Sequence, residues 1–187
     1  AIIRTCDAVG IAALHSVYDE ATFRAHTGTT MGTHKWVDTR IYRNVDEPLT
    51  QLKNNNYQII AADTSGNTLD YREVDYTKPT AVLLGAEKYG ISDAAYPHID
   101  QCVTVPMLGM VESFNVGVAC AIILAEARGQ REAAGLYESR QMSEESYTKT
   151  LFEWTQPLVA KYCQKHDLPY PALNEKGDIV DLDWRKG

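Results

Sequence analysis

The sequence predicts an α/β domain with a mostly parallel sheet. Two observations support this prediction: short strand-like runs alternate with helix-like segments along the first 140 residues, and a long apolar helix follows the last of these runs. The 187 residues are enough for one domain with a substantial core and a short appended segment. Hydrophobic residues make up 44% and charged residues 23%, which is usual for a soluble globular protein.

Five strand-like runs and three predicted helices follow one another in this part of the chain. Alternating or clustered β-branched, aromatic and aliphatic residues mark the runs at 12–18, 36–42, 57–62, 80–84 and 102–105. Apolar residues at helical spacing, or a capping residue, predict helices at 45–55, 92–99 and 114–137, the second of them capped by Ser92. The first half of the last helix is almost wholly apolar, so we expect it to be deeply buried.

The amino terminus reads as the end of a helix. Residues 2–9 have a helical pattern, and Gly10 is the predicted C-terminal cap. Because the chain begins at Ala1 inside this helix, we expect further residues upstream, including a strand. No apolar run reaches the ~18 residues that a membrane span requires.

Near residue 140 the composition changes. Ser143, followed by two glutamates, is a favourable helix start, and we expect this helix to continue to about His166. We therefore predict two parts: residues 1–140 form the α/β domain, and residues 141–187 form a C-terminal helical extension.

Charge and composition argue against several functions. A net charge of −7 disfavours a protein that coats nucleic acid nonspecifically, although a local basic patch could still bind RNA. The four cysteines form no C-x-x-C pair and the five histidines show no ligand spacing, so we expect no metal site and no disulfide framework. These thiols predict a reducing, cytoplasmic location. His26 and His34 remain candidates for contact with RNA.

The segment 85–92 is the first candidate for chemistry. It follows a strand-like run, precedes a predicted helix and carries Gly85 and Gly90. A P-loop would require lysine at the position of Ile91, so nucleotide triphosphate hydrolysis is disfavoured. Two interpretations remain, a ligand-binding loop of another kind and a tight turn that needs a flexible backbone.

Two further candidates lie elsewhere. In the segment 105–115, Ser113 and Asn115 open an apolar helix, where a polar residue can cap the helix or contact a ligand. Arg4 stands beside two isoleucines, so its side chain either reaches solvent, pairs with Asp7 or belongs to a site.

Taken in this order, the three segments resemble the motifs of the SPOUT methyltransferases, and most closely those of the SpoU/TrmH family. The similar stretches are residues 2–10, 84–91 and 105–116. Residues 168–171 and 174–177 also resemble the C-terminal extension of the tRNA-directed members. The resemblance covers nearly the whole chain.

This resemblance implies a fold, an activity and partners. The fold would be an α/β knot, with a deep trefoil knot at the C-terminal end of the domain, and the protein would be a homodimer. The activity would be transfer of a methyl group from S-adenosyl-L-methionine to the ribose 2′-hydroxyl of a tRNA guanosine, of the D-loop Gm18 type, leaving S-adenosyl-L-homocysteine. Alternatives are methylation of rRNA or of the tRNA wobble position, and an RNA-binding dimer without catalysis.

The resemblance also implies roles for particular residues. Those expected to bind the cofactor are Ala62, Gly85, Gly90, Val105, Met107 and Phe114. Arg4 would accept the proton of the ribose hydroxyl, or orient a phosphate and stabilise the developing alkoxide, because arginine is normally always protonated. Glu87, Ser113 and Asn115 would position Arg4 and the ribose across the dimer interface.

Overall fold

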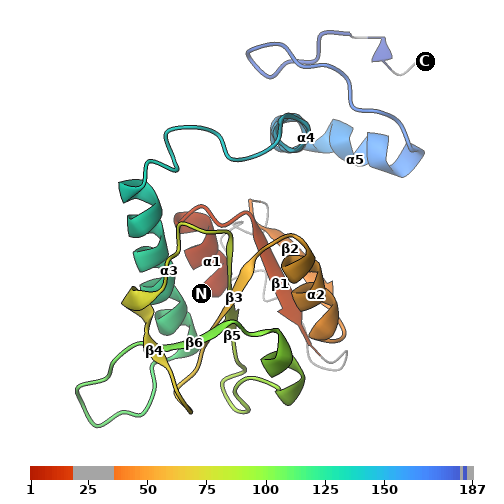
Figure 1. The fold of residues 1–187 in the computed structure, drawn as a ribbon. Coiled ribbons are helices and arrows are strands. Elements are labelled where there is room, and N and C mark those ends of the chain that lie inside the picture. Colours follow the sequence, from red (N-terminus) through yellow and green to blue (C-terminus); the bar gives the residue numbers. More distant parts are fainter. Residues whose placement is uncertain (19–35, 182, 185–187) are drawn as a thin grey trace. The chain divides into compact units, whose positions relative to one another are not determined.

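The computed structural model describes residues 1–18, 36–181, 183 and 184 (Figure 1). The chain divides into two compact units, Ala1–Leu136 and Tyr137–Gly187. The first unit contains, in chain order, α1 (Ile2–Ala8), β1 (Ala13–Val17), β2 (Asp38–Tyr42), α2 (Asp46–Asn54), β3 (Gln58–Ala62), β4 (Leu69–Asp70), the 3-10 helix η2 (Tyr71–Glu73), β5 (Thr80–Leu84), the 3-10 helix η3 (Asp93–His98), β6 (Gln101–Thr104) and α3 (Val116–Ala133).

Every strand pair in the first unit is parallel, which confirms the predicted α/β class for the described residues. The main sheet has the order β4-β6-β3-β5, and β1 and β2 form a separate pair. The five predicted strands are all present. The two-residue strand β4 was not predicted, because a run this short carries no periodic signal.

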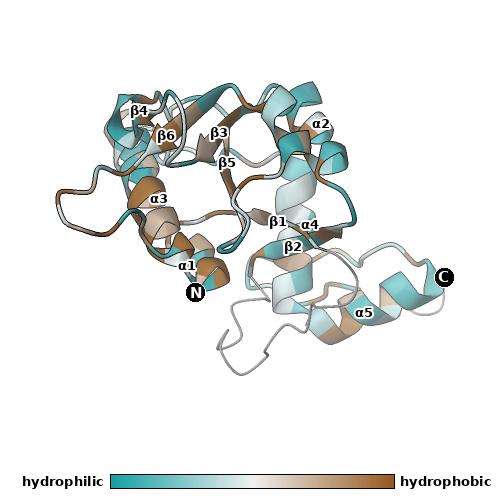
Figure 2. Ribbon diagram, turned by 90° about the horizontal axis from the view of Figure 1, so that it is seen from below, coloured by the Kyte–Doolittle hydropathy of each residue, from teal (hydrophilic) through white to brown (hydrophobic). Residues whose placement is uncertain are grey.

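The main sheet lies between two helical layers. Successive residues of a strand point to opposite faces. Accordingly, Ile60 of β3 packs with Ile123 of α3, whereas Ile59 packs with Leu49 of α2 and Ala95 of η3. Both isoleucines are completely buried. Figure 2 shows the hydrophobic colouring concentrated on β3, β5 and α3, while α2 is mainly hydrophilic.

Helix α1 packs against α3 and ends as the sequence predicts. Gly10 has a φ of 76°, its N–H donates to the carbonyl of Asp7, and the N–H of Ile11 donates to the carbonyl of Cys6. This pair of bonds is a Schellman motif, which glycine favours because it has no Cβ. Cys6 of α1 and Cys120 of α3 are buried in one core cluster.

Two predicted helices of the first unit differ from the structure. The segment 92–99 forms the 3-10 helix η3 and not an α-helix, because Pro97 inside it has no N–H for an α-helical bond. Ser92 is the N-cap residue, but its side chain makes no capping hydrogen bond. Helix α3 is shorter than the predicted 114–137, and its first half is not deeply buried throughout. Val118 is 47% exposed, since a helix that packs on one side buries only one face.

The second unit contains α4 (Glu144–Thr155) and α5 (Pro157–His166). Ser143 caps α4 as predicted, with its Oγ accepting from the N–H of Ser146 at 3.2 Å. The prediction of one continuous helix to His166 is wrong. Gln156 leaves the helical region, with φ of −126° and ψ of 53°, because a residue before proline is excluded from it.

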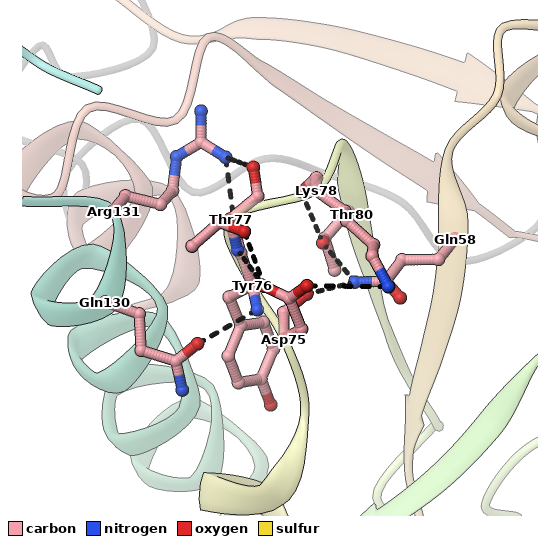
Figure 3. A network of polar contacts seen from close by, with 8 residues as sticks. All are labelled: Gln58, Asp75, Tyr76, Thr77, Lys78, Thr80, Gln130 and Arg131. Atoms are coloured by element: carbon pink, nitrogen blue, oxygen red, sulfur yellow. Dashed lines mark hydrogen bonds and ion pairs between the residues drawn. The ribbon is translucent and has the colours of Figure 1, made fainter. Parts of the chain in front are cut away.

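The connection from η2 to β5 is held by α3 and β3 (Figure 3). Gln130 of α3 accepts from the N–H of Tyr76 at 3.0 Å, and Arg131 donates to the Tyr76 carbonyl at 3.2 Å. On the other side, Nε2 of Gln58 donates to the carbonyl of Asp75 at 2.7 Å. These bonds place the Tyr76 ring in the core against β3, β6 and α3.

Replacing Tyr76 by phenylalanine is expected to raise the free energy of unfolding by about 1 kcal/mol at pH 7, because a buried polar group without a partner destabilises the fold. The ring is 1% exposed, and the hydroxyl has no hydrogen-bond partner among the described residues. Burial raises the pKa of Tyr76 to about 12. The stabilising effect of Tyr76→Phe should therefore grow above pH 10, where the unfolded phenol ionises and the folded one does not.

Urea unfolding at pH 7 and pH 11 measures both effects. Tyr57→Phe is the matched control, because the Tyr57 side chain is 38% exposed and its hydroxyl can reach water. A loss of stability in Tyr76→Phe at both pH values would mean that the hydroxyl has a partner after all.

No helix in the described part of the chain combines the length and the apolar character that crossing a bilayer requires.

Candidate functional site

The carboxyl ends of β3, β5 and β6 lie side by side. Ala62 at the end of β3 pairs with Leu84 of β5 on one side and with Val103 of β6 on the other. Ligands of open parallel sheets bind in the crevice outside these strand ends. A cavity of about 370 Å³ opens at this place.

The cavity is lined by the three loops that leave these strands and by the first turns of α3. A volume of this size, largely apolar with a few polar groups, is typical of small-molecule sites. The lining residues are Ala62, Asp63, Thr64, Leu84, Gly85, Ala86, Glu87, Gly90, Ile91, Val103, Thr104, Val105, Met107, Ser113, Phe114, Asn115, Val116, Ala119 and Ile123.

All six residues expected to bind a cofactor lie in this lining, as do three of the four expected catalytic residues. The sequence analysis did not name Asp63, Thr64 and Thr104 as individual site residues, nor Ala119 and Ile123 of α3. Thr104 ends β6, and Asp63 and Thr64 directly follow β3, so their positions at strand ends were the available signal. His26 and His34 lie outside the described residues.

The loop after β5 is a closed hairpin. The N–H of Ala86 donates to the carbonyl of Gly90 at 2.9 Å, and the N–H of Gly90 donates back at 2.8 Å. A Cβ on Gly85 would lie 2.5 Å from the Gly90 carbonyl carbon, and Gly90 itself has a φ of 67°. The tight-turn interpretation is therefore confirmed, because the turn requires glycine, and the same loop forms part of the cavity wall. The binding of a ligand by this loop stays a prediction.

Asn115 joins this hairpin to the start of α3. Its Oδ1 caps the helix by accepting from the N–H of Gly117 at 2.9 Å, and its Nδ2 donates to Oε1 of Glu87 at 2.9 Å. The N-cap is thus Asn115 rather than Ser113, which lines the cavity. With both ends of its amide engaged, Asn115 holds the Glu87 carboxylate at the cavity wall.

Asp63 places a second carboxylate in the cavity wall. Its Oδ1 accepts from the N–H groups of Thr64 and Ser65 and from the Ser65 hydroxyl, at 2.7, 3.0 and 2.9 Å. Its Oδ2 accepts from the Tyr96 hydroxyl at 2.8 Å. Burial by itself raises the pKa of Asp63, but the bonds from Tyr96 and Ser65 outweigh burial and hold the pKa below its ordinary value.

The described cavity lining contains no lysine, arginine or histidine. Its charged side chains are the two carboxylates, Asp63 and Glu87, and the partners that bind them are neutral. A cation is therefore favoured in this cavity over an anion of similar shape. In the part of the chain that the structure describes, no group of three histidine, cysteine, aspartate or glutamate side chains could hold a metal ion.

Arg4 does not line the cavity of its own chain. Its side chain is exposed, and the described residues form no ion pair with it, Asp7 included. Helix α1 nevertheless begins beside α3, since a Cβ added at Gly117 would lie 3.4 Å from the Cβ of Ala1. Arg4 thus stands on a helix that starts next to the N-terminus of α3.

Comparison with known proteins gives two family matches and close relatives. Residues 1–125 match the model of the SpoU rRNA Methylase family, and residues 129–182 match that of its C-terminal region. The tRNA (guanosine(18)-2′-O)-methyltransferase of Escherichia coli is 42% identical over 98% of this chain and 82% of its own length. The enzyme of that name from Thermus thermophilus is 46% identical over 82% of this chain and 79% of its own length.

Two solved structures of SpoU-type proteins are also similar to this chain. The TrmH/SpoU tRNA modifying enzyme of Aquifex aeolicus superposes with a TM-score of 0.74 at 37% identity, covering 90% of this chain and 82% of that one. The SpoU methyltransferase AviRb of Streptomyces viridochromogenes, solved in complex with the cofactor AdoMet, gives a TM-score of 0.64 at 27% identity. That match covers 71% of this chain and 55% of AviRb.

Proposed function

The chain belongs to the SpoU rRNA methylase family, and we propose on this basis that it methylates the ribose 2′-hydroxyl of a tRNA guanosine with S-adenosylmethionine. The observation that carries this function is the identity of 41–46% to tRNA (guanosine(18)-2′-O)-methyltransferases over most of both chains. Position 18 in the D-loop is accordingly the proposed target. The alternatives, rRNA, the wobble ribose and a non-catalytic dimer, have no comparable support.

The cavity fits S-adenosylmethionine. When bound, this cofactor supplies a methyl group activated by a positively charged sulfur. An apolar wall that includes Val105, Met107 and Phe114 suits an adenine ring. Gly85 and Gly90 keep the hairpin free of side chains, so that its backbone can approach the nucleoside. The carboxylates of Asp63 and Glu87 suit a cation.

The chain's own residues orient the ribose and stabilise its oxygen. Ser113 and the Glu87–Asn115 pair lie in the cavity wall where the hairpin meets α3, and they position the substrate beside it. Arg4 stabilises the alkoxide that develops as the 2′-hydroxyl loses its proton, and an RNA phosphate beside it assists. Holding the hydroxyl in line with the methyl donor supplies much of the acceleration.

The functional unit is a homodimer whose cavities are completed across the interface. The position of Arg4 outside the cavity of its own chain supports this proposal. The apolar side chains of Met110 and Val118, which are exposed in the single chain, support it as well.

Family membership supports a trefoil knot in the segment that forms the cavity. The described cysteines are all free thiols, which supports action in the cytoplasm.

Mapping of methylated nucleosides tests the proposed function. Unmodified tRNA is incubated with the protein and methyl-labelled S-adenosylmethionine, digested, and analysed for 2′-O-methylguanosine. We expect one labelled guanosine, at position 18, and no label in a matched transcript in which that guanosine is replaced. Label confined to the wobble position, or found only in rRNA incubated in parallel, would change the proposed target. RNA binding without any label would mean that the protein is a non-catalytic RNA-binding dimer.

A further inference from the structure

We propose that Asp63 makes the cavity discriminate between the charged sulfur of S-adenosylmethionine and the neutral sulfur of S-adenosylhomocysteine. The inference rests on the proposed function, because it assumes that this cofactor binds between the three loops. It assigns to Asp63 a role in specificity and in product exchange, and no role in proton transfer.

The first support is the state of the Asp63 carboxylate. Four hydrogen bonds hold it in place, from two backbone N–H groups and from the hydroxyls of Ser65 and Tyr96. All four donors are neutral. The carboxylate is therefore oriented, but these donors do not neutralise its negative charge.

The second support is the surroundings of this charge. Asp63 is half-buried in the cavity wall, and no basic side chain of the described lining offsets it. A charge that has lost part of its hydration and has no oppositely charged partner favours a ligand of opposite charge. Glu87 differs, because it is exposed and so keeps more of its hydration.

The reaction itself changes the charge that Asp63 would sense. As the carbon–sulfur bond breaks, the sulfur keeps the bonding electron pair and becomes neutral, the ribose oxygen bonds to the methyl carbon, and the hydroxyl proton leaves to the medium. The two forms of the cofactor carry the same ammonium, carboxylate, ribose and adenine groups. A contact of Asp63 with any of these shared groups would affect both forms alike, whereas attraction to the sulfur affects only the substrate form.

The consequence is a bias in the exchange of product for substrate. Before transfer, the carboxylate attracts the bound cofactor; after transfer, that attraction is lost while the other contacts persist. Asp63 thus weakens the binding of the product relative to that of the substrate, and so favours its replacement.

The test measures binding rather than turnover. Calorimetry on the full chain gives the dissociation constants of S-adenosylmethionine, S-adenosylhomocysteine and sinefungin, an analogue with a protonated amine near the position of the sulfur. In Asp63→Asn we expect the preference for the substrate over the product to fall about tenfold, or 1.4 kcal/mol. Sinefungin should lose affinity together with the substrate.

Two further variants control the result. Glu73→Gln removes the same charge from an exposed position outside the cavity lining, and it should leave the preference unchanged. Tyr96→Phe keeps the Asp63 charge but removes one donor, so it should reduce the preference by less than Asp63→Asn. It also keeps the test decisive if Asp63→Asn unfolds, which circular dichroism detects.

The outcomes separate this inference from the proposed function. An equal loss of affinity for all three ligands in Asp63→Asn would place the carboxylate on a shared group and overturn the inference alone. An unchanged preference would do the same. If the unmodified chain binds neither form of the cofactor, the proposed function itself is wrong.

Discussion

Replacing Arg4 by alanine is expected to reduce tRNA methylation at least about a hundredfold, which is the typical loss when one preorganised group is removed from a developing oxyanion. The affinity for S-adenosylmethionine should stay within about twofold, because Arg4 lies outside the cavity of its own chain and its proposed role is at the ribose oxygen. Initial rates of label transfer and calorimetry measure the two quantities. Arg128→Ala is the matched control, since Arg128 is also exposed and its ion pair with Glu132 is long, at 3.9 Å.

The same variant can show which subunit uses Arg4. In a heterodimer of one Arg4→Ala subunit and one Asn115→Ala subunit, the first keeps an intact cavity and the second keeps Arg4. If Arg4 completes the cavity of the partner, one of the two sites is whole and activity returns to about half. If Arg4 acts within its own chain, both sites are damaged and the heterodimer stays inactive. Wild-type activity of the Arg4→Ala homodimer would remove Arg4 from the mechanism altogether.

The strands of the first unit could be predicted because each is a short apolar run between turn residues. The predicted strand at 80–84 agrees with β5 at both ends. Helix ends with chemical signals were also predictable, as the Gly10 motif and the Ser143 cap show. The failures at Pro97 and Pro157 have a common cause: capping residues indicated where each helix starts, and the local effect of proline then decided how the segment continued.

The candidate site was predictable only where residues are close in sequence. Glycines and capping residues mark the hairpin and the start of α3. The Glu87–Asn115 bond joins residues 28 positions apart, and the Asp63–Tyr96 bond joins residues 33 apart, so both depend on the strand order. No local pattern shows that β3 lies between β5 and β6, which is what brings Asp63 to the cavity. The role of Arg4 was still harder to predict. Within one chain Arg4 lies outside the cavity, so its proposed role depends on a second subunit.

The second large effect is expected for Gly85→Ala, which should weaken S-adenosylmethionine binding at least about tenfold. The new Cβ would meet the carbonyl carbon of Gly90 at 2.5 Å, its oxygen at 2.8 Å and the nitrogen of Ile91 at 2.8 Å. All three are backbone atoms, so no side-chain rotation relieves the clash. The hairpin must open, and the wall of the cavity moves with it. Overpacking of this kind costs about 1–3 kcal/mol.

The fold should survive this change, because Gly85 lies outside the three core clusters. Thermal unfolding and calorimetry on one preparation separate the loss of binding from the loss of structure. Gly129→Ala is the matched control: its Cβ meets nothing within 4 Å, and in the interior of α3 alanine should stabilise by about 0.5–1 kcal/mol without changing affinity. Undiminished binding by Gly85→Ala would mean that the hairpin does not close in solution. The backbone of this loop could then not be the surface that holds the nucleoside.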